Sequence, residues 1–454
     1  MSIRIMSRRR KKFPEPRTAV IESLSHDGRG ICHVDDKVVF VHRALPGEEV
    51  KFRYCRTRSK FDEGDVLEVI KPSPLRIEPR CQHFGICGGC SQQHLSSESQ
   101  IAAKQERLLE SLEKIGKVKP ESVLPPLTAE TWGYRRKARL GVKYMGRDKI
   151  VRVGFRERSS SFLANLNRCE ILHPSIGERT KELSELILKL SIKDKIPQIE
   201  IAVGDENAAL IFRHLEELSE TDLELLRQFG QDTQLLIFLQ SGGPKTVVRL
   251  FPKRGPEDTA SDESTKLSYF LPDYDVEMQF QPTDFTQVNA SLNQKMINLA
   301  IELLSPKKDD RVLDLFCGLG NFSLPLARKA GAVVGVEGEA SLVGRARDNA
   351  SQNNITNVEF FTADLNGDLA LEPWYGAGFN KLLLDPPRSG APMVVANLPK
   401  PLPDRIVYVS CDPATLARDA GTLVNEQGYR LVSVGVMDMF PHTAHVESIA
   451  LFER

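Results

Sequence analysis

The feature that most constrains the fold is a regular alternation of short apolar runs and helical stretches in the C-terminal part of the chain. From Thr283 onward, seven runs rich in β-branched and aliphatic residues are separated by segments of helical character; they are 311–315, 332–336, 357–361, 379–384, 404–409, 430–437 and 447–452. Strands that alternate with helices form a mostly parallel sheet with crossover helices on its faces. We therefore expect an α/β, Rossmann-like domain over residues 273–454.

The first strand of this pattern runs into a glycine-containing loop. Asp314 lies in the strand, and Gly318-Leu-Gly320 follows it. Glycine lets the chain turn sharply and lets a cofactor approach the backbone. Three details favour S-adenosylmethionine over a dinucleotide. The third glycine of the dinucleotide fingerprint is missing, Glu337 ends the next strand in a place to bind ribose hydroxyls, and Asp364 ends the strand after that.

A thiol and two carboxylates accompany the later strands. Asp385 precedes two prolines after one apolar run, Cys411 directly follows another, and Glu447 begins the last. C5 of a uracil becomes nucleophilic once a thiolate has added to C6, and a base must afterwards remove the C5 proton. Arg388 stands where amine-directed methyltransferases usually place an aromatic residue, which argues against methylation of an amine. The pattern predicts methyl transfer to a ring carbon, with Cys411 as nucleophile and Glu447 as base.

The N-terminal part has a different character. Residues 17–73 alternate short β-rich runs with turns such as Asp27-Gly-Arg-Gly30, which is typical of a small barrel. The net charge of the chain is zero, but Met1–Arg17 holds seven Arg or Lys against one Glu, and Trp132–Arg168 holds eleven against two acidic residues. Local basic segments of this kind indicate contact with nucleic-acid phosphates.

The remaining boundaries follow from composition and periodicity in the 454 residues. We expect a basic arm at 1–16, the barrel at 17–73, a cysteine-containing segment at 74–95, a linking helix within 96–125, a middle α+β domain at 126–272 and the α/β domain at 273–454. The linking helix should span about Ser96–Ile115 with Ser97 as its cap, and the middle domain should contain helices near 176–190 and 221–228. Residues 255–268 are polar and acidic, as in an exposed loop. No apolar run is long enough to span a membrane and no secretory signal is evident, so a cytoplasmic protein is expected.

Four cysteines indicate an inorganic centre. Cys81, Cys87 and Cys90 have the spacing C-x5-C-x2-C, and Cys169 is a fourth candidate. Four thiolates suit either tetrahedral zinc or a [4Fe–4S] cluster. Zinc sites more often show two close C-x2-C pairs and this chain has one, so the spacing favours iron–sulfur. Three further cysteines are expected to be small apolar side chains: Cys32, Cys55 and Cys317.

Several segments resemble known families. Leu24-Ser-His-Asp-Gly-Arg-Gly-Ile and the following strand resemble a TRAM domain, an RNA-binding barrel related to OB-folds. The segments that begin at Asp385, Tyr408 and Asp438 resemble the signatures of the RNA uracil-C5 methyltransferase family. The resemblance covers essentially the whole chain and is strongest for the members that methylate uridine 1939 of bacterial 23S ribosomal RNA.

This resemblance implies site residues and partners. Cys411 would be the nucleophile and Glu447 the base, and a [4Fe–4S] cluster would be held by the four cysteines above. The residues implied to line the cofactor and target-base site are Gln287, Phe316, Asn321, Glu337, Asp364 and Asp385. The substrate would be folded 23S ribosomal RNA with the target uridine flipped out, and neither a membrane nor an obligate protein partner is implied. Asp412 departs from the family, in which Asn is frequent, and would raise the pKa of the thiol if it pointed inward.

Three alternatives stay open at this point. The first is a uracil-C5 methyltransferase that acts on another ribosomal or transfer RNA uridine, although such relatives often lack the barrel or the cysteine cluster. The second is a cytosine-C5 methyltransferase, which would typically carry a thiol where Arg388 stands. The third is a non-catalytic iron–sulfur RNA-binding protein, which would have no need of Cys411 and Glu447.

Overall fold

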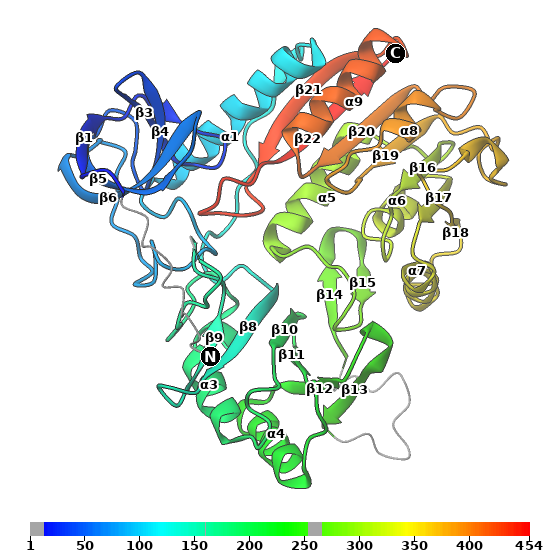
Figure 1. Cartoon of the computed structure of the whole chain (residues 1–454). Helices are drawn as coiled ribbons and strands as arrows, with labels where there is room; N and C mark the ends of the chain where they lie inside the picture. Colours follow the sequence, from blue (N-terminus) through cyan, green and yellow to red (C-terminus); the bar gives the residue numbers. More distant parts are fainter. Residues whose placement is uncertain (1–12, 159, 253–265) are drawn as a thin grey trace, which may run out of the picture. The chain divides into compact units, whose positions relative to one another are not determined.

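The computed structural model describes residues 13–158, 160–252 and 266–454, so most of the predicted basic arm and of the predicted acidic loop lies outside the described residues. The chain divides into two compact units (Figure 1). We call Met1–Gly85, Cys90–Gln100 and His442–Ala444 the barrel unit, and Ile86–Gly89, Ile101–Pro441 and His445–Arg454 the large unit. Among the described helices none is both long and apolar enough to cross a membrane.

The barrel unit contains a six-stranded sheet in the order β1-β5-β6-β4-β3-β2. Its strands are β1 (Arg17–Val20), β2 (Ser23–Leu24), β3 (Gly30–Val34), β4 (Lys37–His42), β5 (Glu49–Thr57) and β6 (Phe61–Lys71). Alternate residues are buried, as in Val39 and Val41 of β4, because successive side chains of a strand face opposite sides. Cys32 is fully buried in this core, as expected for an apolar filler. The predicted runs are confirmed as strands, and β2 and β3 complete the sheet.

A helix follows the barrel strands. It consists of α1 (Ser97–Ser111) and one π-helical stretch, η1 (Leu112–Gly116), in good agreement with the predicted span. The predicted cap is wrong by one residue. The hydroxyl of Ser96 accepts a hydrogen bond from the Ser99 N–H at 3.3 Å, and Ser97 is already the first helical residue.

The middle part of the large unit is a six-stranded sheet in the order β13-β12-β11-β10-β8-β9. Its strands are β8 (Lys137–Met145), β9 (Ile150–Gly154), β10 (Gln198–Val203), β11 (Ala208–Arg213), β12 (Leu236–Gln240) and β13 (Val247–Phe251). The helices are α2 (Pro174–Gly177), α3 (Thr180–Lys189) and α4 (Glu220–Thr233). The α+β character is confirmed; the helix expected near 176–190 is divided into α2 and α3, and the helix expected at 221–228 continues to Thr233.

The C-terminal part of the large unit is an eight-stranded sheet in the order β18-β17-β16-β19-β20-β22-β21-β7. Its strands are β7 (Ser122–Val123), β16 (Arg311–Leu315), β17 (Ala332–Glu337), β18 (Val358–Thr362), β19 (Lys381–Leu384), β20 (Arg405–Ser410), β21 (Arg430–Met437) and β22 (Glu447–Glu453). The helices are α5 (Ala290–Leu304), α6 (Ser323–Lys329), α7 (Ala340–Gln352), α8 (Pro392–Ala396) and α9 (Pro413–Asn425). A hairpin of β14 (Ser268–Leu271) and β15 (Val276–Gln279) precedes α5.

Two features of strand order create the site. β16 pairs with both β17 and β19, so the direction of winding reverses there, and a crevice at the carboxyl ends of these strands is where such sheets bind ligands. β22 enters antiparallel between β20 and β21. The start of β22 therefore lies beside the end of β20, with Ser448 opposite Ser410.

Candidate active site

The predicted thiol and the predicted base are neighbours in the sheet. Cys411 directly follows β20 and Glu447 is the first residue of β22, so the Ser410–Ser448 pairing brings the two together. Asp385 follows β19, which pairs in parallel with β20 through Leu384 and Tyr408. Three groups that are far apart in the sequence thus meet at one edge of the sheet.

The electrostatics of these groups agree with this proximity. Burial and then the negative charge of Asp385 raise the pKa of Glu447 to about 8, while Arg388 and Lys104 oppose the shift. Burial, followed by the charges of Glu447 and Asp385, raises the pKa of the Cys411 thiol to about 11. Burial raises the pKa of Asp385 to about 7. Each carboxylate disfavours a second negative charge nearby, as expected when acids share a confined site.

Asp412 does not add to this negative charge. It caps α9: its Oδ1 accepts hydrogen bonds from the N–H groups of Ala414 at 2.9 Å and Thr415 at 3.2 Å. A carboxylate at a helix N-terminus is stabilised by the exposed N–H groups and by the helix dipole. The departure from the family pattern is therefore a helix cap.

The turn after Asp385 is held by a buried polar cluster that the sequence analysis did not identify. Asp419 accepts hydrogen bonds from the Tyr408 hydroxyl at 2.6 Å and the Ala391 N–H at 2.7 Å. Arg418 donates to Asp419 and, at 2.9 Å, to the carbonyl of Ser389. Gly390 has φ +74, and a Cβ there would lie 2.5 Å from Arg418 Nη2, so only glycine fits.

A cationic and aromatic group lies at the same edge. Arg388 Nη2 is 3.3 Å from His445 Nδ1, and the His445 ring lies 5.3 Å from the Phe440 ring. Burial, with added repulsion from Arg388 and other cations, lowers the pKa of His445, which favours the neutral imidazole beside Arg388. Neither the Arg388–His445 contact nor the packing of Phe440 against His445 was predicted from the sequence.

The glycine loop has the conformation that a cofactor loop requires. Gly318 and Gly320 have φ values of +55 and +93, and Phe316 has φ +65. The predicted ribose ligand Glu337 ends β17, and its Oε2 accepts the Gly318 N–H at 3.1 Å. Asp385 and Glu337 both help raise the pKa of buried Asp314, which reaches about 8 chiefly through burial. The loop and Asp385 therefore belong to one continuous site.

The other predicted cofactor residues lie on three further segments of the chain, and their hydrogen bonds differ. Asn321 accepts a hydrogen bond from the Tyr269 hydroxyl at 2.8 Å and exchanges hydrogen bonds with Asn293. Asp364 lies two residues beyond β18, where it accepts the Asn366 N–H at 3.0 Å. Gln287 is half-buried in the loop that leads into α5.

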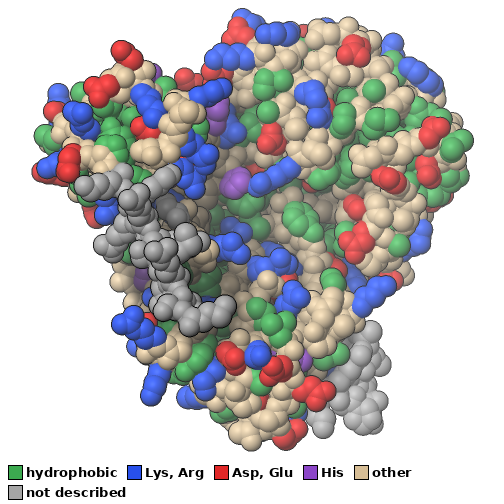
Figure 2. Space-filling model, viewed as in Figure 1, with side chains coloured by type: hydrophobic (Ala, Val, Ile, Leu, Met, Phe, Trp, Pro, Cys, Tyr) green, Lys and Arg blue, Asp and Glu red, His purple; other side chains and the backbone are tan. Residues whose placement is uncertain are grey.

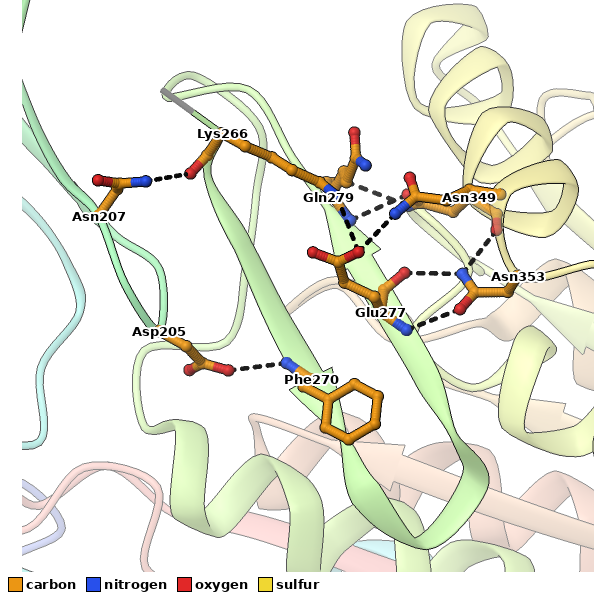
Figure 3. Close-up of polar contacts among 9 residues, drawn as sticks. Asp205, Asn207, Lys266, Phe270, Glu277, Gln279, Asn349 and Asn353 are labelled. Atoms are coloured by element: carbon orange, nitrogen blue, oxygen red, sulfur yellow. Dashed lines mark hydrogen bonds and ion pairs between the residues drawn. The ribbon is translucent and has the colours of Figure 1, made fainter. Parts of the chain in front are cut away.

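The β14–β15 hairpin is a second unpredicted support of the glycine loop (Figure 3). Asn349 of α7 and Asn353, which caps the end of α7, bond the backbone of β15, and Asn349 Oδ1 accepts the Gln279 N–H at 2.9 Å. Asn349 Nδ2 also donates to the carbonyl of Leu319, between the two glycines, at 3.3 Å. On its other side the hairpin is bonded to the middle sheet through Asp205, which accepts the Phe270 N–H at 2.8 Å.

The predicted cluster ligands are distributed over both units. Cys81 and Cys90 belong to the barrel unit, and Cys87 and Cys169 belong to the large unit. All four are partly buried. The Gly89 N–H donates to Cys87 Sγ at 3.4 Å, an interaction that favours a thiolate. The meeting of the four thiols stays a prediction.

The barrel holds one further group of potential metal ligands among the described residues. One donor atom each of His42, Cys55 and Glu63 lies within 4.8 Å of the others. Glu63 already accepts a hydrogen bond from Arg56 at 3.4 Å. We assign no function to this group.

Comparison with known proteins identifies the family of the chain. A family model described as tRNA (Uracil-5-)-methyltransferase matches residues 263–454, and a TRAM domain model matches residues 16–67. The solved structure of the tRNA (uracil-54, C5)-methyltransferase of Pyrococcus abyssi, in complex with S-adenosyl-L-homocysteine, is 25% identical. It aligns over 96% of this chain and 99% of its own, with a TM-score of 0.70.

Two bacterial relatives are much more similar. The 23S rRNA (uracil(1939)-C(5))-methyltransferase RlmD of Nitrosococcus oceani is 54% identical over 449 residues, which cover 98% of each chain. The RlmD of Alkalilimnicola ehrlichii is 52% identical over 450 residues, which cover 99% of each chain. The chain is thus a TRAM-containing member of the RNA uracil-C5 methyltransferases. Within them it belongs to the family of the 23S rRNA uracil-1939 enzymes called RlmD.

Proposed function

We propose that this protein transfers a methyl group from S-adenosylmethionine to C5 of uridine 1939 in 23S ribosomal RNA. Relatives that carry this name align with nearly the entire chain at more than half identity. The observation that supports the chemistry most directly is the Ser410–Ser448 register, which brings Cys411 beside Glu447 at the edge where Asp385 also lies. The alternatives of a cytosine-C5 methyltransferase and of a non-catalytic RNA-binding protein are less favoured, because these relatives are named as uracil-C5 methyltransferases.

The reaction follows from the positions of three groups. Cys411, which is partly buried, gives its proton to water, and its thiolate adds to C6 of the flipped-out uracil, which places an enolate electron pair at C5. That pair attacks the sulfonium methyl carbon, and S-adenosylhomocysteine leaves. Glu447 then takes the C5 proton, the C5=C6 double bond forms again, and the Cys411 thiolate is expelled.

The glycine loop is the proposed cofactor site. S-adenosylmethionine supplies the methyl group, and the chain's part is to bind and orient it. We assign the ribose to Glu337, the adenine side to Asp364, and further contacts to Phe316, Asn321, Gln287 and Asp385. The positive φ values of Gly318 and Gly320 support this assignment, because they open the backbone to close approach.

Removal of the Tyr269 hydroxyl should weaken this cofactor site. In Tyr269→Phe, Asn321 loses the hydrogen bond of 2.8 Å that orients its amide. A hydrogen bond of this kind contributes about 1 kcal/mol, so the KM for S-adenosylmethionine should rise roughly fivefold while kcat changes little. Steady-state kinetics with Tyr274→Phe as the matched control would check this. Equal KM values for both variants would contradict the assignment.

We further propose that Cys81, Cys87, Cys90 and Cys169 hold a [4Fe–4S] cluster. Four partly buried cysteines are the donor set that such a cluster requires, and the Gly89 N–H to Cys87 Sγ contact is typical of cluster ligands. Bound there, the cluster would supply a rigid thiolate-held centre, and no step of the methyl transfer needs its electrons. We therefore propose that the cluster has a structural or RNA-contacting role.

RNA binding is assigned to the barrel and to the basic middle part. In the barrel, Arg29 lies over the Phe40 ring at 4.5 Å and is ion-paired with Asp27; arginine and aromatic side chains are the residues that contact unpaired bases. Figure 2 shows many Lys and Arg side chains on the face of the molecule that it draws. Basic and aromatic side chains of this kind would bind the phosphates and unpaired bases of a folded RNA whose target uridine is flipped out. We propose a cytoplasmic location, because the proposed substrate is ribosomal RNA.

The first test is an anaerobic incubation with tritiated methyl-labelled S-adenosylmethionine and unmodified 23S ribosomal RNA. Nucleoside analysis should yield labelled 5-methyluridine, and mapping should place it at uridine 1939. Labelled 5-methylcytidine would contradict the base assignment. Label at another uridine, or label only in transfer RNA, would contradict the substrate assignment.

A further inference from the structure

Lys104 is a buried cation in the helix that follows the barrel. It lies on the apolar face of α1, at helical spacing from Ile101 and Leu108, and its side chain is only 3% exposed. A lysine is almost never buried this completely unless it is paired, because removal of an ammonium group from water is costly. The position therefore calls for a specific explanation.

The contacts of Lys104 lead toward the active site. Its Nζ donates hydrogen bonds to Asp438 Oδ1 at 2.6 Å and to the carbonyl of Phe440 at 3.1 Å. Asp438 is itself buried, directly follows β21, and donates its N–H to the carbonyl of Leu127. Lys104 thus holds the chain by two hydrogen bonds just after β21, and the chain returns to the sheet at Glu447.

We propose that Lys104 is a positioning residue for Glu447: it anchors the chain between β21 and β22, and its ammonium charge favours the carboxylate form of Glu447. This inference rests on the proposed function, in which Glu447 removes the C5 proton as a carboxylate.

The charges that surround Glu447 support this role. Asp385 disfavours its ionisation, and the cations that oppose this effect are Arg388 and, more weakly, Lys104. Cys411, His445 and Asp438, which follows the partner of Glu447 in β21, are the other titratable groups at this edge. Arg388 is exposed to solvent, which screens its charge, whereas Lys104 acts from the interior. Burial lowers the pKa of Lys104, and the charges of Asp438 and, more weakly, of Glu447 oppose this effect, so the coupling between Lys104 and Glu447 is mutual.

Four variants separate the charge of Lys104 from its packing. Lys104→Met removes the charge and retains an unbranched side chain, and Lys104→Arg retains the charge. In Lys104→Met a buried aspartate is left without its cation, and this loss could by itself unfold the protein. We therefore add Asp438→Asn and the double variant Lys104→Met/Asp438→Asn, in which no aspartate is left unpaired. Comparison of the last two isolates the ammonium group on a background without the aspartate charge.

The readout is the rate at which the covalent RNA–protein adduct resolves, followed on denaturing gels as a function of pH in the full-length protein. The pH midpoint of this step should rise by about one unit in Lys104→Met relative to wild type, and by a similar amount in the double variant relative to Asp438→Asn. Adduct should accumulate severalfold at pH 7.5. Lys104→Arg should restore most of the wild-type profile, and Asp438→Asn should move the midpoint downward.

Equal midpoints in Asp438→Asn and in the folded double variant would overturn the inference and leave Lys104 a purely structural residue. Failure of the underlying function would look different. In that case Glu447→Gln would resolve the adduct at the wild-type rate. A stalled Glu447→Gln together with unchanged Lys104 variants would refute only the role of Lys104.

Discussion

Cys411→Ser should abolish methyl transfer, with a loss of activity on the order of 10⁴-fold or more. A serine hydroxyl has nearly the same shape, but its much higher pKa leaves almost no alkoxide to add to C6 of the uracil. The site does not compensate for this difference, because the burial and the charges of Glu447 and Asp385 that raise the pKa of the native thiol to about 11 would also disfavour an alkoxide at this position. Single-turnover kinetics with saturating 23S ribosomal RNA would measure the loss.

The matched control for this prediction is Cys55→Ser, a cysteine of the barrel outside the proposed catalytic machinery. It should methylate at close to the wild-type rate. Cys411→Ser should still bind S-adenosylmethionine with wild-type affinity, because the cofactor loop is unchanged. A Cys411→Ser rate within tenfold of wild type would show that the reaction does not pass through this thiol.

The sequence predicts the elements of the α/β domain far better than their order. Each apolar run between 311 and 452 corresponds to a strand, because a buried strand is recognisable from its own residues. The insertion of β22 between β20 and β21 is a long-range pairing that leaves no local pattern. The sequence could therefore propose Cys411 and Glu447 as partners from chemistry and family resemblance, whereas their adjacency depends on the Ser410–Ser448 register.

The role of Asp412 as a helix cap is visible in its own neighbours in the sequence. An aspartate followed by proline is a strong helix start, because aspartate caps the free N–H groups and proline fits the first helical position. The structure has this arrangement at α9, with Pro413 as the first residue of the helix. The Asp-Pro pair therefore indicates that the Asp412 carboxylate accepts hydrogen bonds from the first N–H groups of the helix and does not point toward the Cys411 thiol.

The supporting polar residues could not be predicted from local patterns. Lys104 and Asp438 are 334 residues apart in the chain, and Asn349 reaches Leu319 across 30 residues. A polar residue within a helix suggests a solvated face unless its partner is known. The domain boundaries and the convergence of the four cysteines stay predictions.

Glu447→Gln should separate the two halves of the reaction. Glutamine matches glutamate in shape and cannot take the C5 proton, so release of the methylated RNA should slow by about 10²- to 10⁴-fold. The addition step should be retained or even accelerated, because the Glu447 charge raises the pKa of Cys411 and its removal lowers that pKa. The expected product is a methylated RNA–protein adduct that survives denaturing electrophoresis.

The pH dependence gives this prediction a second, independent readout. The wild-type adduct should resolve faster as the pH rises through about 8, because Glu447 acts as a base only when ionised and burial raises its pKa to about 8. Glu447→Gln should lose this rise, and Glu359→Gln, an exposed residue of β18, should keep it. Rapid turnover of Glu447→Gln without adduct would exclude Glu447 as the base. Asp385 would then be the next candidate, since its pKa of about 7 leaves it largely ionised above neutral pH.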